Sequence, residues 1–89
     1  MKIGPLKELV LLGNDDKANF SPPMIILNMT ADGCYEYLAA ANQLVLEGIL
    51  MDDPEKLVNP DRLVFFMTPK GVQAHRDLAT KKLAQAVAA

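Results

Sequence analysis

Cysteine and histidine are scarce in this sequence, and their scarcity excludes several kinds of site. Cys34 is the single cysteine, so the chain forms no internal disulfide and is not a disulfide-stapled secreted scaffold. His75 is the single histidine, and one cysteine with one histidine cannot supply the three or four ligands of a zinc site without suitably spaced carboxylates. We find no such spacing. The sequence therefore predicts no metal site and no cofactor.

Long apolar runs are also missing. No stretch approaches the roughly 18 apolar residues that a membrane-spanning helix requires. The first residues, 1–5, lack the apolar core of a signal peptide, and Glu8 interrupts the apolar residues after them. With 51% hydrophobic and 22% charged residues, the composition is that of a globular protein. We predict one cytoplasmic domain spanning residues 1–89, with no membrane partner.

Positive charge is missing from the middle of the chain. Residues 32–51 contain no lysine or arginine, and residues 32–61 carry a net charge of −6. Residues 62–89 carry a net charge of +4. An acidic middle and a basic end can attract each other within the fold or between two copies, or they can be separate solvated faces. The sequence leaves these alternatives open.

The first third of the chain predicts two short helices. Pro5 in a first turn, the apolar run 6–12 and the pair Gly13-Asn14 mark a helix with its end. Ser21-Pro22 favours a second helix start, with residues 24–27 as its apolar body. The β-branched residues in that body make a strand the alternative, because a short apolar run cannot be assigned from its period alone.

The clearest predicted helix covers residues 31–47. Thr30 is expected to cap it, and Gly48 ends it. At 3.6 residues per turn it is apolar over well above half its circumference, beyond the stripe of about 100° that a surface helix shows. Its polar face is limited to Glu36, Ala40, Gln43 and Glu47. This helix is therefore either the centre of the domain or partly in contact with another chain.

The last third predicts two strands and a long helix. Residues 49–51 and 62–67 are expected as strands, separated by turn-forming clusters. Thr68-Pro69 is a cap followed by a first-turn proline, opening a helix over about residues 70–87. Its expected apolar stripe is Val72, His75 or Arg76, Ala79, Leu83 and Val87. The predicted class is α+β, mostly helical, with three to four helices and a two-stranded hairpin.

Three short motifs resemble the winged helix-turn-helix domain of MarR-like regulators over residues 21–80. Residues 44–50 resemble the exit from a recognition helix into the wing, and residues 66–71 resemble the Leu-Thr-Pro-x-Gly junction after it. Residues 52–62 resemble the acidic, proline-containing wing. The resemblance implies a dimeric transcriptional regulator with helix 31–47 at duplex DNA. Its DNA-binding candidates are Gln43, Lys56, Arg62 and Lys70.

The charge pattern departs from that family. A recognition helix normally presents polar and basic side chains to DNA, whereas helix 31–47 contains no cation and would be repelled by phosphates. The alternative is a winged-helix module that binds a protein or a second copy instead of DNA. Its predicted interface consists of Tyr35, Tyr37 and Leu44.

Catalytic chemistry is not predicted. Cys34 near a helix start could act as a nucleophile only with a base, and His75 lies on a different predicted helix. A buried cysteine and a packing or surface histidine are the simpler interpretation. The acidic run 52–55 lacks the alternation and glycine of a calcium loop, and no phosphate-binding loop or metalloprotease motif occurs. We expect neither an enzyme nor a small-molecule substrate.

Overall fold

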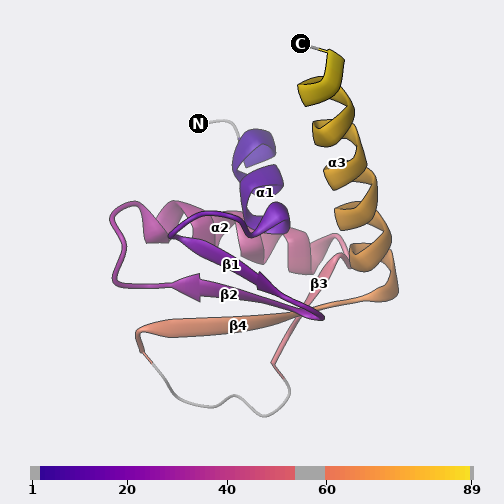
Figure 1. Ribbon diagram of the computed structural model, residues 1–89. Coiled ribbons are helices and arrows are strands. Elements are labelled where there is room, and N and C mark those ends of the chain that lie inside the picture. The colour runs from indigo at the N-terminus through magenta and orange to yellow at the C-terminus, as the bar shows by residue number, and fades with distance from the viewer. Residues whose placement is uncertain (1–2, 54–59, 89) are drawn as a thin grey trace.

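The computed structural model describes residues 3–53 and 60–88 as three helices and four strands (Figure 1). In chain order they are α1 (Ile3–Leu12), β1 (Ala18–Ser21), β2 (Met24–Asn28), α2 (Cys34–Leu46), β3 (Leu50–Asp52), β4 (Arg62–Met67) and α3 (Pro69–Ala88). The predicted α+β class is confirmed, with about half of the chain helical. The sheet is larger than the expected two-stranded hairpin.

All four strands form one antiparallel sheet in the order β1-β2-β4-β3. The prediction of a strand at 62–67 paired with a strand near 49–51 is confirmed, and Met51 lies opposite Phe66. On its other side β4 pairs with β2, where Phe66 lies opposite Met24. An interior strand such as β4 packs side chains against two neighbours on each face, which suits its β-branched and aromatic residues.

The prediction of a helix that begins at Ser21-Pro22 is wrong. The two prolines form the turn of the β1–β2 hairpin, and residues 24–28 are strand β2. A proline pair fits a tight turn as well as it fits a helix start, because both positions tolerate a missing N–H. Burial then alternates along β2, with Ile25 and Leu27 buried. Residues 24–28 form a strand and not a helix because they pair with β4, which is distant in sequence.

Helix α2 ends as predicted but begins differently. Gly48, at φ 77°, follows its last turn. At the start, Gly33 at φ 81° occupies the cap position and no side chain caps the helix. The Thr30 hydroxyl instead donates a hydrogen bond to Oδ1 of Asn28 (2.6 Å), because the turn after β2 brings the two side chains together. Thr30 therefore closes a turn and does not cap α2.

Helix α3 begins as predicted, with Oγ1 of Thr68 accepting a hydrogen bond from the N–H of Gly71 (3.1 Å). The expected apolar stripe is only partly correct, because Val72 and Leu83 are exposed. Ala74 and Leu78 pack against the core instead. The first half of α3 contacts the rest of the domain, and the second half extends away from the sheet (Figure 1). No helix among the described residues is long and apolar enough to cross a membrane.

The core lies between one face of the sheet and the helices α1 and α2 (Figure 1). Ile25, Leu27 and Leu50 point from the strands into this layer, and Val10 meets them from α1. All four are fully buried. Each such aliphatic side chain contributes about 1.5–3 kcal/mol of hydrophobic stabilisation. Because the helices pack on one side, the two faces of the sheet have different environments.

Candidate functional site

The face of the sheet that points away from the helices has an apolar centre on β2, β3 and β4. Alternate residues of β2, β3 and β4 point to this side, since successive side chains of a strand alternate between faces. Strand register makes them neighbours: Met24 lies opposite Phe66, and Ile26 opposite Val64. We call the set Met24, Ile26, Met51, Val64 and Phe66 the outer face. Its members are half-buried or exposed, and no described helix packs against them.

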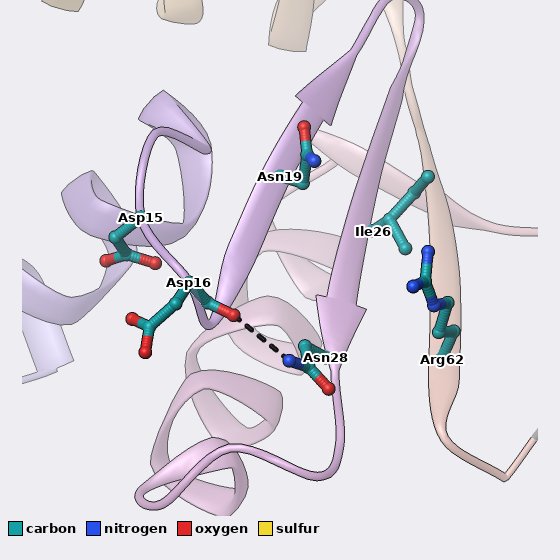
Figure 2. A pocket seen from close by; sticks show the side chains of 6 residues that line it. All are labelled: Asp15, Asp16, Asn19, Ile26, Asn28 and Arg62. Carbon is teal, nitrogen blue, oxygen red and sulfur yellow. Dashed lines mark hydrogen bonds between the residues drawn. The ribbon is translucent and has the colours of Figure 1, made fainter.

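A polar pocket adjoins one end of the outer face. Arg62 at the start of β4 lies opposite Asn28 at the end of β2, and Asn19 of β1 lies opposite Ile26. The loop before β1 completes the rim with Asp15 and Asp16 (Figure 2). The enclosed volume is about 150 Å³. Figure 2 shows the acidic loop on one side of this pocket and Arg62 on the other.

Asp15 is fixed in place by the protein itself. One of its carboxylate oxygens accepts hydrogen bonds from the N–H groups of Lys17 and Ala18 (both 2.9 Å), and the other accepts one from the Tyr37 hydroxyl (2.6 Å). Burial opposes ionisation, but these hydrogen bonds and the Lys17 charge outweigh it and hold the pKa of Asp15 below its usual value. Asp15 therefore remains ionised and anchors the loop.

The pKa of Tyr37 shifts in the direction opposite to that of Asp15. Burial, and then its hydrogen bond to Asp15, raise the pKa of Tyr37 to about 12. The Lys17 ammonium lies 5.6 Å from the centre of the Tyr37 ring. Tyr37 is thus a neutral donor that ties helix α2 to the rim of the pocket.

Two charged side chains at the pocket are free to meet a partner. Asp16 is exposed, and its backbone carbonyl oxygen accepts a hydrogen bond from Nδ2 of Asn28 (3.3 Å), drawn in Figure 2. Arg62 is exposed, and its side chain makes no hydrogen bond or ion pair with any described residue. A surface with an apolar centre, one cation and one carboxylate is chemically suited to a protein partner.

The structure separates the predicted DNA-binding residues. Arg62 is the first residue of β4, a strand roughly 20 Å long, and Lys70 lies in α3 beyond the other end of that strand. Nζ of Lys70 donates a hydrogen bond to the carbonyl oxygen of Glu47 (3.0 Å), so this cation already satisfies the end of α2. Gln43 is exposed on α2. Lys56 lies outside the described residues.

Of the three predicted interface residues, the structure leaves only Tyr35 at the surface. Tyr35 is 78% exposed on α2, whereas Tyr37 and Leu44 are 5% and 2% exposed. Tyr37 and Leu44 lie in the core, since α2 packs against α1 and the sheet at once. Buried side chains cannot form a surface interface, so these two assignments are corrected. Leu46, which is not among the predicted interface residues, is exposed instead.

The two candidates for nucleophilic chemistry serve packing. Sγ of the buried Cys34 donates to the carbonyl oxygen of Met29 (3.4 Å), as the simpler interpretation predicted. Nδ1 of His75 donates to the carbonyl oxygen of Leu11 (2.7 Å), and its ring stacks on Phe20 with centroids 4.0 Å apart. No cluster of three or more potential metal ligands occurs among the described residues.

Sequence reasoning missed the outer face, although β4 carries a signal for it. Leu63, Phe65 and Met67 alternate with Val64 and Phe66, so this strand is apolar on both sides. Strands that read as continuous apolar runs are typical of sheets covered on both faces. In the described fold helices cover only one face of β4, and Val64 and Phe66 on the second face are half-buried.

A second hollow lies where α1, the end of α2 and α3 meet. It encloses about 270 Å³ and is lined mainly by apolar residues that include Leu11, Ile49 and Leu78. The ion pair between Nζ of Lys7 and Oε2 of Glu47 (2.8 Å) lies at this hollow. Neither its apolar lining nor this surface ion pair indicates a chemical role.

Comparisons with known proteins identify no family for this chain. No protein-family model matches the sequence, and searches among curated proteins and solved structures found no match.

Proposed function

We propose that this domain is a protein–protein interaction module that binds its partner through the outer face. The observation that carries the proposal is the set of five large apolar side chains held in register on three strands. A contiguous exposed apolar patch of a few hundred Å² on a monomeric protein is often a functional surface. No described helix covers it.

The distribution of charge supports a protein partner over DNA. Nucleic-acid affinity depends largely on lysine and arginine side chains that neutralise phosphates. The outer face has Arg62 as its neighbouring cation, and Asp16 lies on the opposite side of the adjoining pocket (Figure 2). The exposed side of α2 carries Glu36 and Gln43 and has no cation. Neither surface therefore offers the excess of positive charge that a phosphate backbone requires.

Binding of an apolar dye tests whether the outer face is accessible in the folded chain. Anilinonaphthalene sulfonate fluoresces when it binds exposed apolar surface, and we expect the native chain to enhance its fluorescence. The double variant Ile26→Gln/Phe66→Gln should reduce this signal strongly. The matched control Tyr35→Gln/Leu46→Gln changes the exposed apolar residues of α2 and should leave most of it. The reverse ranking, in folded variants, would move the binding surface to α2.

A DNA-binding winged-helix regulator, acting as a dimer, is the second candidate. The order α2, β3, β4, α3 supports it, as do the exposed cations Arg76, Lys81 and Lys82 on α3. In this alternative α2 would enter the groove with Gln43, and Arg62 would meet a phosphate.

A titration of duplex DNA at low and moderate salt separates the two candidates. The interaction module predicts no binding even at low salt. Salt-sensitive binding that Arg62→Ala weakens, while the control Gln73→Ala on α3 does not, would establish the DNA-binding candidate instead. Each salt-dependent contact should contribute about one unit to the slope of log affinity against log salt.

A further inference from the structure

We propose that the partner on the outer face is a second copy of this chain, bound sheet to sheet, with Arg62 of each copy beside Asp16 of the other. This inference rests on the proposed function and names its partner. It is carried by two observations on one surface: the apolar residues of β2 and β4, and the opposite charges at their end.

The strand register makes the outer face self-complementary. A two-fold axis running along the strands between β2 and β4 exchanges these two strands between copies. Met24 of one copy then lies over Phe66 of the other, and Ile26 over Val64, because these are register partners within each sheet. Two sheets packed in this way lie about 10 Å apart with interdigitating side chains. Every large side chain of β2 and β4 on this face meets an apolar neighbour.

The same axis brings opposite charges together. Arg62 is the register partner of Asn28, so Arg62 of one copy comes to lie over Asn28 of the other. Nδ2 of Asn28 donates a hydrogen bond to the backbone carbonyl oxygen of Asp16 (3.3 Å), which places this residue next to that position. The exposed carboxylate of Asp16 points away from Asn28 (Figure 2), so it turns toward the partner's arginine when the contact forms. A long arginine side chain can reach it. Each copy contributes one cation and one carboxylate to this pairing, so the pair forms twice in the dimer.

The size of the face predicts how strong the contact is. Strands lie about 4.8 Å apart and rise about 3.3 Å per residue, so the face measures roughly 15 by 20 Å. Stable interfaces commonly bury about 800 Å² on each partner, which is more than this face provides. We therefore expect a reversible dimer that forms as the concentration rises.

Sedimentation velocity over a concentration series tests the contact. The wild-type chain should shift from monomer to dimer, and Val64→Lys should abolish the shift. Leu46→Lys, on the exposed side of α2, is the matched control and should dimerise like the wild type. Circular dichroism and urea unfolding identify any variant that fails to fold.

A charge exchange tests the specific geometry. Arg62→Asp alone and Asp16→Arg alone each place like charges in the contact and should weaken dimerisation by roughly tenfold. The double variant Arg62→Asp/Asp16→Arg should restore most of the affinity, because the pair is re-formed with its signs reversed. Failure of restoration in a folded double variant would overturn the assigned pairing.

The outcomes separate this inference from the proposed function. A chain that stays monomeric at all concentrations, yet binds the apolar dye through Ile26 and Phe66, would overturn the self-contact and leave the interaction module standing. A dimer that Leu46→Lys abolishes and Val64→Lys leaves intact would overturn both.

Discussion

The two faces of one sheet have nearly the same hydrophobicity and opposite environments. Ile25 and Phe65 point to the inner face, where α1 and α2 bury them. Ile26 and Phe66, one position further along each strand, point to the outer face and are only half-buried. Neighbouring residues of the same type therefore differ in their surroundings: the inner set stabilises the domain, and the outer set is the one that we propose binds a partner.

The largest expected difference separates the neighbouring residues Phe65 and Phe66. Phe65→Ala removes a ring that is 4% exposed and should lower the free energy of unfolding by about 4 kcal/mol. Phe66→Ala should lower it by about 1 kcal/mol in dilute solution, because that ring keeps contact with water. Urea unfolding of both variants measures the difference. Equal losses would show that the outer face is as tightly covered as the inner one.

Gly71 holds α3 against the strand region on the inner side. A Cβ atom built there would overlap the carbonyl oxygen of Ile49, a backbone atom that cannot move aside cheaply. Gly71→Ala should therefore destabilise the domain by about 3 kcal/mol. Gly4→Ala is the matched control, since a Cβ atom on Gly4 meets nothing within 4 Å and alanine favours a helix. Thermal unfolding should show a large loss only for Gly71→Ala.

Tyr37 connects the core to the pocket beside the outer face. Tyr37→Phe removes a hydrogen bond to an ionised carboxylate and should cost about 2 kcal/mol at neutral pH. Asp15 has a lowered pKa, so its contribution is present above the unfolded value of 3.8 and is lost as the pH falls through the lower folded value.

Tyr37 has a raised pKa, so its contribution is present below 10 and is lost as the pH rises from 10 towards about 12. Unfolding free energies measured across both pH ranges should show wild type and Tyr37→Phe converging at each extreme. Parallel curves would contradict the assigned hydrogen bond.

The smallest effect is expected on the exposed side of α2, which serves as a third surface for comparison. Leu46 is 80% exposed, so Leu46→Ser should change the free energy of unfolding by less than about 0.5 kcal/mol. Urea unfolding checks this value. A clear loss of stability would mean that Leu46 has a contact that its exposure does not indicate.

Local sequence signals predict the elements that they define by themselves. The β-branched and aromatic run 62–67 predicts strand β4 at its observed residues, and Thr68-Pro69 and Gly48 correctly mark a helix start and a helix end. The β1–β2 hairpin is missed because Ser21-Pro22 fits a turn and a helix start equally well. Only pairing with β4, about forty residues away, distinguishes the two.

The candidate site is less predictable than the fold. The sequence identifies Arg62 as a candidate residue, although the role it predicts is contact with a phosphate. The position of Arg62 opposite Asn28 follows from a strand pairing that no local signal indicates. Tyr37 and Leu44 are predicted at a surface because an α-helix pattern shows which residues share a stripe and not which stripes are covered. Their burial depends on α1, which packs against α2 from a distant part of the chain.

The most direct test measures solvent access to side chains on the two faces at low and high protein concentration. A soluble paramagnetic probe broadens the NMR signals of exposed methyl groups. In dilute solution we expect strong broadening of Ile26 and Val64, and little for Ile25 and Leu27. At high concentration the first pair should become protected. Protection of Ile26 and Val64 equal to that of Ile25 and Leu27 in dilute solution would contradict the central claim that the outer face is open.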